Sequence, residues 1–372
     1  MRKLRVGVVG AGRLGGFHAQ KLAAMPQAEL IAVADPLPGA RDRVAAACHV
    51  EALDDPRNLH GRVDAVVIAA PTRLHHALGL EFLARGTHVL MEKPLATTAA
   101  EGEELVETAR RNGAVLQVGH VERFNPAFEA AAPYLRGPKF IEAVRTSPFT
   151  FRSTDVGAVL DMMIHDLDLI HSLVRTSVAK VEALGISVLG GHEDVAHARL
   201  EFECGCVAVL SASRVSFETQ RRMQAWAPRA FAGVDFAART ATIVQPSETL
   251  LQRRFDVQAI SPEQVENAKS QLTEEHLPQK QFTFAAVDAL ALELDDFIES
   301  IRAPRLPRVT GQQGLAALQT AELILAKIAA HAWDATSDGR IGPLGVPRPR
   351  VIPAPHFDLS AAQVPLRKRE AG

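Results

Sequence analysis

Short apolar runs alternate with amphipathic stretches over about the first 120 residues of the chain. The apolar runs span 4–9, 30–34, 64–70, 88–91 and 114–118. Stretches with helical patterning lie between them, at 17–25, 73–85 and 97–112. Near-continuous apolar strands that alternate with helices are typical of a parallel sheet covered on both faces. The pattern therefore predicts an α/β domain over residues 1–122.

The pattern changes after about residue 125. Strand-like runs follow one another at 139–147, 180–188, 195–202 and 206–214, with weaker candidates at 240–245 and 255–260. The Glu203–Cys206 turn indicates a hairpin, and hairpins imply a mainly antiparallel sheet. Helical patterning is confined to 156–174, 287–301 and 313–331. We therefore predict a second, α+β domain with an open, mainly antiparallel sheet over residues 123–342.

Two segments fall outside this organisation. Residues 261–283 are polar and charged, which predicts an excursion or insertion. Residues 343–372 are rich in proline and basic groups, so we expect a tail without regular structure.

Composition narrows the range of functions. The chain has 372 residues and a formal net charge of -2, and 47% of its residues are hydrophobic, which suits two domains with apolar cores. Nothing in this charge suggests a basic face for nucleic acid. Three cysteines argue against a disulfide framework. We expect neither a signal peptide nor a membrane-spanning segment, and hence a cytoplasmic protein.

The turn after the first apolar run reads Gly10-Ala11-Gly12-Arg13-Leu14-Gly15, which matches the G-x-G-x-x-G pattern. The first glycine permits the tight turn, the second lets the backbone approach a pyrophosphate, and the third lets helix and strand pack closely. The pyrophosphate would lie at the helix N-terminus, where the dipole favours negative charge. Asp35 follows about 20 residues later, where an acid binds the ribose hydroxyls and repels a 2′-phosphate. A Rossmann domain that binds NAD is predicted.

Two further groups suggest chemistry. Lys93, in Glu92-Lys93-Pro94, follows the fourth apolar run at its carboxyl end, where open parallel sheets bind ligands. Asp161 and His165 are four residues apart in an apolar helical stretch, which puts both on one helix face, with Asp168 near the same face. Such groups cost free energy in an apolar helix unless they are paired or functional. The alternatives are a solvated lysine and a buried histidine satisfied by a neighbouring carboxylate.

Taken in order, these motifs resemble the Gfo/Idh/MocA oxidoreductase family over nearly the whole chain. The resemblance rests on the glycine motif, Ala70-Pro71-Thr72 with His75, Glu92-Lys93-Pro94, Gly119 with Arg123-Phe124-Asn125-Pro126, Asp161 with His165, and Val309-Thr310-Gly311.

The resemblance implies a role for each site residue. Lys93 would contact both the substrate hydroxyl and the nicotinamide, His165 would be the general base, and Asp161 would bind the substrate or tune the site. No metal is implied. The implied cofactor contacts are Gly10, Gly12, Arg13, Leu14, Gly15, Asp35, Pro71, Thr72, His75, Glu92, Lys93 and Gln117.

The stretches 118–126, 155–170 and 192–216 resemble a branch of the family that oxidises UDP-N-acetylglucosamine at its 3-hydroxyl. This branch supplies a 3-keto sugar nucleotide for amination in lipid A biosynthesis. A diphosphate needs cationic partners, for which Arg123, Arg152 and Arg214 are candidates, with Asn125 as a further substrate contact. The alternative for each arginine is ordinary ion pairing.

Other functions remain open at this point. Ala158-Val159-Leu160 and Met163 stand where many relatives have glycines, so we expect a reshaped pocket wall. A free sugar or polyol is the alternative substrate. A non-catalytic NAD-sensing regulator is a third reading, although such a protein need not retain Lys93, Asp161 and His165 together.

The resemblance also implies assembly. In the family, sheet faces commonly pair, and an open sheet with an uncovered apolar face must bury that face somewhere. We expect a homodimer or homotetramer.

Overall fold

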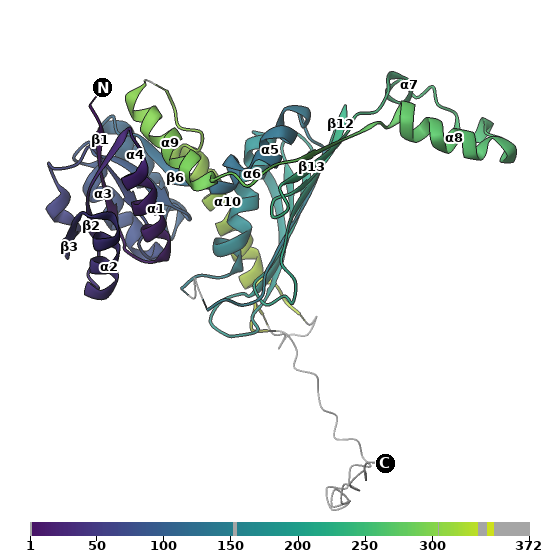
Figure 1. Ribbon diagram of the computed structural model, residues 1–372. Coiled ribbons are helices and arrows are strands. Elements are labelled where there is room, and N and C mark those ends of the chain that lie inside the picture. Colours follow the sequence, from purple (N-terminus) through teal and green to yellow (C-terminus); the bar gives the residue numbers. More distant parts are fainter. Residues whose placement is uncertain (1, 152–154, 304, 334–340, 346–372) are drawn as a thin grey trace, which may run out of the picture.

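The computed structural model describes residues 2–151, 155–303, 305–333 and 341–345. The described chain forms two sheets with associated helices, and an arm projects from the second sheet (Figure 1). The predicted fold class, a parallel-sheet domain followed by an α+β domain, is confirmed. Within the described ranges, no helix has the length and apolar character that crossing a bilayer requires.

The first sheet is parallel throughout, with the strand order β3-β2-β1-β4-β5-β6. Val6, Val8 and Val67 are fully buried in it, as expected where helices cover both faces. The strands are β1 (Leu4–Val9), β2 (Ala28–Ala34), β3 (Glu51–Leu53), β4 (Ala65–Ile68), β5 (His88–Glu92) and β6 (Leu116–Gly119). The helices are α1 (Arg13–Ala24), α2 (Pro38–Cys48), α3 (His75–Leu83) and α4 (Ala99–Arg111).

The second sheet has eight strands in the order β14-β13-β12-β11-β7-β10-β9-β8. Only the pairing of β7 with β10 is parallel among its described pairs. Its strands are β7 (Phe140–Thr146), β8 (Val178–Ile186), β9 (Val195–Phe202), β10 (Val207–Ser213), β11 (Gln220–Ala227), β12 (Ala230–Asp235), β13 (Thr240–Val244) and β14 (Gln279–Thr283). The predicted β9–β10 hairpin is confirmed.

Helices cover one face of this sheet. They are α5 (Pro126–Ala131), α6 (Ile164–Val174) and α10 (Gly311–Ala330), and they lie between the sheet and the first domain (Figure 1). The opposite face carries aromatic side chains on adjacent strands. The ring centre of Trp226 lies 5.2 Å from that of Phe140 and 4.9 Å from that of Phe231.

The helix α9 (Ala289–Arg302) returns to the first domain (Figure 1). Leu294, Phe297 and Ile298 are fully buried, in the same apolar cluster as Val6 and Val8 of β1. The division at residue 122/123 places this helix in the second domain by sequence, whereas its core contacts lie in the first.

The segment between β13 and β14 is the arm. It contains α7 (Glu248–Leu251), α8 (Val265–Gln271) and a π-helical turn at Leu272–His276, none of which has a buried residue. The predicted insertion at 261–283 therefore holds, except that its last residues form β14. The strand predicted at 255–260 is wrong, because Asp256 caps a 3-10 turn at Val257–Ala259. Of the proline-rich tail, residues 346–372 lie outside the described residues.

Candidate active site at the domain boundary

The glycine-rich turn between β1 and α1 has the backbone geometry of an anion-binding loop. Gly10 has a φ of 98°, and a Cβ there would lie 2.5 Å from the carbonyl oxygen of Ala69. A Cβ on Gly15 would lie 1.8 Å from the carbonyl oxygen of Gly10, so the helix packs on the turn only without a side chain. The N-terminus of α1 has no side-chain cap, which leaves its first amides available to a phosphate.

Asp35 folds back over this turn from the end of β2. Its Oδ2 accepts a hydrogen bond from the Ala11 amide (2.7 Å), and its Oδ1 accepts one from the Leu37 amide (2.8 Å). These bonds hold the carboxylate beside the glycine loop. Arg13 and Leu14 lie on the exposed side of the same loop.

His75 ties the segment after β4 to the segment after β5. Its ring is buried, with Nδ1 2.8 Å from the Pro94 carbonyl oxygen and Nε2 2.9 Å from that of Ala70. Burial lowers the pKa of His75, so the imidazole is neutral and donates to one of the two carbonyls. The loop with Pro71 and Thr72 is thereby fixed beside the glycine turn.

Lys93 connects the two domains. It follows β5, and its Nζ donates to the Asp161 carboxylate (Oδ1, 2.9 Å) and to the Asp161 carbonyl oxygen (2.6 Å). The two side chains are 17% and 23% exposed, so the pair is shielded from bulk water but open on one side. An amine from the first domain and a carboxylate from the second therefore meet at the carboxyl edge of the parallel sheet.

His165, in the first turn of α6, lies within range of the Lys93 charge. Its Nδ1 is buried and has no hydrogen-bond partner among the described residues. Burial lowers the pKa of His165 well below its usual value, and the positive charge of Lys93 lowers it further. The imidazole is therefore neutral near pH 7 and able to accept a proton.

A π-helical turn at Val159–Met163 presents Asp161 to Lys93. Glu193, from the loop between β8 and β9, holds this turn by accepting hydrogen bonds from the amides of Val159 (carboxylate, 3.0 Å) and Ala158 (carbonyl, 2.9 Å). A Cβ on Gly157 would lie 2.1 Å from the Glu193 carboxylate. The predicted regular helix is thus wound more widely at Asp161, as is frequent at functional sites.

Comparison with known proteins agrees with this geometry. Residues 4–120 match the oxidoreductase family with an NAD-binding Rossmann fold, and residues 119–229 match the GFO/IDH/MocA C-terminal domain. The chain belongs to the Gfo/Idh/MocA oxidoreductase family. It is an NAD-dependent oxidoreductase, as the glycine motif predicts.

Several members of the family are similar to this chain over most of its length. UDP-N-acetylglucosamine 3-dehydrogenase of Acidithiobacillus ferrooxidans is 35% identical over 325 residues, which cover 85% of this chain and 96% of that one. A solved structure of this enzyme, GnnA, has a TM-score of 0.76 at 32% identity and covers 88% of this chain and 98% of its own. Scyllo-inositol 2-dehydrogenase (NAD(+)) of Bacillus subtilis is 30% identical over 240 residues, which cover 58% of this chain and 68% of that one.

The other predicted substrate contacts of this Gfo/Idh/MocA member lie in buried positions. Arg123 is 7% exposed, its Nη2 donates to the Arg308 carbonyl oxygen (3.2 Å), and its Nε lies 3.6 Å from Asp168. Asn125 caps α5 by accepting a hydrogen bond from the Ala127 amide (3.1 Å). Both residues thus hold the backbone that leads into the second domain.

Arg214 is similarly engaged. Its Nε donates to Asp194 (2.8 Å) and its Nη1 to the carbonyl oxygen of Val156 (2.6 Å), and the side chain is 7% exposed. Arg152, the remaining candidate, lies outside the described residues. Direct contact of these arginines with a substrate diphosphate stays a prediction.

Two residues near His165 have no predicted role. His120 follows β6, and its buried ring lies edge-on to His165 with ring centres 6.1 Å apart. Its place after a parallel strand is a signal that sequence reasoning could have used. Arg221 of β11 is 51% exposed, and its charge contributes to the lowered pKa of His165. The strand β11 itself is absent from the predicted elements, so no sequence signal points to Arg221.

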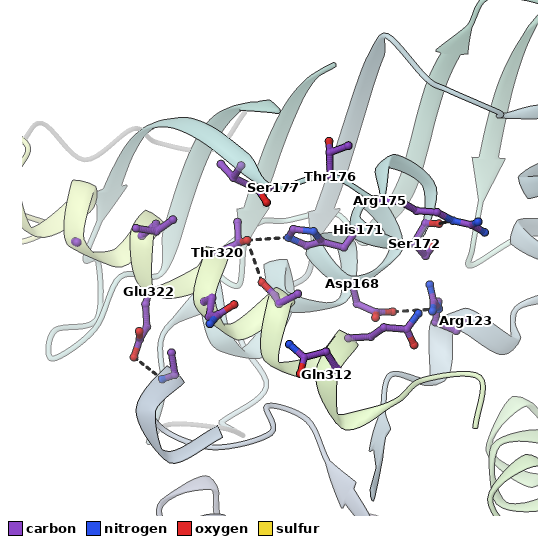
Figure 2. A pocket seen from close by; sticks show the side chains of 17 residues that line it. Arg123, Asp168, His171, Ser172, Arg175, Thr176, Ser177, Gln312, Thr320 and Glu322 are labelled. Carbon is purple, nitrogen blue, oxygen red and sulfur yellow. Dashed lines mark hydrogen bonds and ion pairs between the residues drawn. The ribbon is translucent and has the colours of Figure 1, made fainter. Parts of the chain in front are cut away.

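A cavity of about 890 Å³ lies between α6 and α10 (Figure 2). Asp168 and Arg123 line it, and His171 Nε2 lies 2.7 Å from Thr320 Oγ1 across it. Lys93, Asp161 and His165 are not among its lining residues. This cavity is therefore distinct from the candidate active site.

Proposed function

We propose that this chain oxidises the 3-hydroxyl of UDP-N-acetylglucosamine to a ketone. The observation that carries the proposal is the meeting of Lys93, Asp161 and His165 at the sheet edge that holds the glycine motif. The choice of substrate is supported by the Acidithiobacillus ferrooxidans relative of that activity, 35% identical over 85% of this chain. The product, a 3-keto sugar nucleotide, would supply a transaminase in lipid A precursor synthesis.

Some residues of the candidate site would bind the cofactor, and others would activate the substrate hydroxyl and accept its proton. The glycine turn would hold the pyrophosphate of NAD and Asp35 its ribose, and bound NAD supplies the hydride acceptor. The Lys93 ammonium donates a hydrogen bond to the substrate oxygen and favours its ionisation. His165, held neutral, accepts the hydroxyl proton. Asp161 orients the Lys93 ammonium.

The pH profile of kcat/KM follows from the state of His165. The pKa of this imidazole is lowered, so activity should persist as pH falls through the range in which an ordinary histidine protonates, and should decline only at lower pH. The free energy of unfolding depends on pH in the same direction. Below the ordinary histidine pKa, the unfolded chain binds a proton at His165 that the folded site does not bind, so the fold becomes less stable as pH falls. An acid limb at or above pH ~6.5 would contradict this assignment.

The substrate is tested by following reduced nicotinamide spectroscopically. Purified protein is incubated with NAD and UDP-N-acetylglucosamine, and in parallel with glucose and with myo-inositol. We expect kcat/KM to be highest with the sugar nucleotide. A single-turnover measurement with enzyme in excess guards against recycling of the cofactor on the enzyme. A higher kcat/KM with myo-inositol would overturn the proposed substrate.

The second candidate is a polyol dehydrogenase, because several relatives that act on inositol match this chain. One of them is 30% identical over 58% of the chain. The same site would serve, with a free cyclitol in place of the sugar nucleotide. A non-catalytic regulator is disfavoured because Lys93, Asp161 and His165 are all present and adjacent.

Arg221 offers a test of sugar-nucleotide recognition. Its half-exposed guanidinium, near His165, is suited to bind a phosphate oxygen. Arg221→Gln should raise KM for the sugar nucleotide at least about tenfold, with kcat changed less than about threefold, because a charge-assisted hydrogen bond contributes roughly 1.5–3 kcal/mol. Arg229→Gln, on another exposed arginine, is the control. An unchanged KM in Arg221→Gln would exclude this contact.

We also propose that the uncovered face of the second sheet joins copies of the chain into a homodimer or homotetramer. Phe140 and Trp226 are each 37% exposed there, although they pack on each other. Trp226→Glu should lower the mass measured by light scattering at micromolar concentration, because it places a charge in an apolar contact. Leu306→Glu, at a 79% exposed position elsewhere, should leave the mass unchanged. A monomeric wild type would refute the assembly.

A further inference from the structure

Three titratable side chains meet beneath the candidate active site. His18 of α1, Glu92 of β5 and Glu293 of α9 are all buried, and their potential ligand atoms lie within 4.8 Å of one another. His18 Nε2 and Glu92 Oε1 form a hydrogen bond of 2.6 Å. The cluster joins the helix of the glycine motif, the strand that leads to Lys93 and the returning helix of the second half of the chain.

Glu293 has no visible partner in this cluster. Both carboxyl oxygens are buried, and neither has a hydrogen bond to any described residue. Gln117, which neighbours it on β6, donates its Nε2 to the Glu293 carbonyl oxygen (3.0 Å) rather than to the carboxyl group. Buried polar groups without a partner are rare in folded proteins, so this carboxyl group requires an explanation.

The surrounding charges oppose ionisation of Glu293. Burial raises its pKa well above the ordinary value, and Glu92, Asp296 and Asp168 raise it further. His18 is bonded to Glu92, and Arg123, on the turn next to α9, faces Asp168. Two adjacent carboxylates in an apolar setting cannot both carry charge without a cation or a proton between them.

We propose that Glu293 is held as a neutral carboxylic acid whose O–H donates to Glu92, and that this acid pair positions Lys93. Glu92 Oε2 accepts a hydrogen bond from the Lys93 amide (3.3 Å), while Oε1 is bonded to His18. Gly119 leaves room for this carboxylate, since a Cβ there would lie 2.8 Å from Oε2. In this arrangement, the hydrogen bond from the Glu293 O–H is the third contact that holds the Glu92 carboxylate, after those of His18 and the Lys93 amide. The positioning role rests on the function proposed for Lys93, whereas the shared proton does not.

The pH dependence of unfolding tests whether Glu293 is protonated in the folded protein. A carboxyl group that is protonated in the fold and ionised in the unfolded chain releases a proton on unfolding, so it favours the fold less as pH rises above its ordinary pKa. Between pH ~5 and ~7, the ratio of the wild-type unfolding constant to that of Glu293→Gln should therefore rise about tenfold per pH unit. Glu299→Gln, on the exposed side of α9, should show a constant ratio. A constant ratio in Glu293→Gln as well would overturn the proposal.

Infrared spectroscopy and metal analysis separate a proton from a bound cation. The wild type should show a protonated-carboxyl C=O band that shifts in D2O and is absent in Glu293→Gln. Stoichiometric zinc or another metal in the purified protein, lost in the variant, would mean that a cation bridges the two carboxylates, and would refute the acid pair.

The effect on Lys93 is measured by comparing two substitutions. Glu293→Met removes the donor to Glu92 and should lower kcat about tenfold, whereas Glu293→Gln keeps an N–H donor and should recover most of this loss. Equal activities of the two variants would refute the positioning role. If Lys93→Met retains turnover, the function proposed for Lys93 fails, while the unfolding and infrared results still decide where the proton lies.

Discussion

Lys93→Met and His165→Asn are each expected to lower kcat by about 10³-fold while NAD affinity stays within about threefold of wild type. The Lys93 ammonium reaches across the domain boundary to Asp161, and it is placed to stabilise negative charge on the substrate oxygen. His165 is held neutral because partial burial and the positive charge of Lys93 lower its pKa, so the imidazole is free to accept a proton. Neither side chain belongs to the glycine turn or to Asp35, so the pyrophosphate and ribose contacts should persist.

The measurement pairs steady-state kinetics with NAD titration by fluorescence or calorimetry. His197→Asn, on β9, replaces an exposed histidine bonded to Ser211 and should keep full activity. A loss of NAD affinity as large as the loss of turnover would contradict the role of His165 as base. If both variants kept the wild-type kcat, the proposal that Lys93 and His165 form the active site would be refuted.

The first sheet is predictable from the sequence because its strands are buried on both faces. Runs such as Val6–Val9 and Ala65–Ile68 are uniformly apolar, and the intervening helices complete the alternation. The exception is β3, a strand of three residues of which two are exposed, which leaves no apolar run to detect.

The second sheet is harder to predict because its strands have one buried face. In β11 only Met223 and Ala225 are buried, and they alternate with arginine and glutamine. The segment 255–260 has strand-like composition but lies in the exposed arm, where Asp256 bonds the Gln258 amide and turns the chain instead. Alternation of apolar residues marks a strand only if a core exists to receive them.

The candidate site shows the same division between local and distant information. The spacing of Asp161 and His165 predicts that both lie on one helix face, whereas the π-helical turn at Val159–Met163 depends on Glu193 of a distant loop. The sequence does not indicate that Arg123 and Arg214 are ion-paired, because their partners Asp168 and Asp194 are not adjacent to them in the chain. The partners of a buried charge are set by tertiary packing, so sequence alone does not separate a substrate-binding arginine from a structural one.

Substitution of the third glycine should damage the fold, whereas substitution of the second should damage only cofactor binding. In Gly15→Ala the new Cβ would lie 1.8 Å from the backbone oxygen of Gly10, a group that cannot move without opening the β1–α1 turn. We expect a loss of at least ~3 kcal/mol in the free energy of unfolding, as for other severe backbone clashes. In Gly12→Ala the Cβ meets no protein atom within 4 Å, so stability should change by less than ~0.5 kcal/mol.

Substitution of Gly12 should have a large effect on NAD affinity, although it has little effect on stability. If its backbone approaches the pyrophosphate, a methyl group there occupies the space of a phosphate oxygen, and NAD affinity should fall at least about 30-fold, or ~2 kcal/mol. Gly39→Ala, in α2 with open space around its Cβ, should stabilise the fold by ~0.5–1 kcal/mol and leave NAD binding unchanged. Chemical denaturation and NAD titration of the three variants give both quantities. Unaltered NAD affinity in Gly12→Ala would show that the pyrophosphate does not lie on this turn, because the substitution leaves the protein itself nothing to lose there.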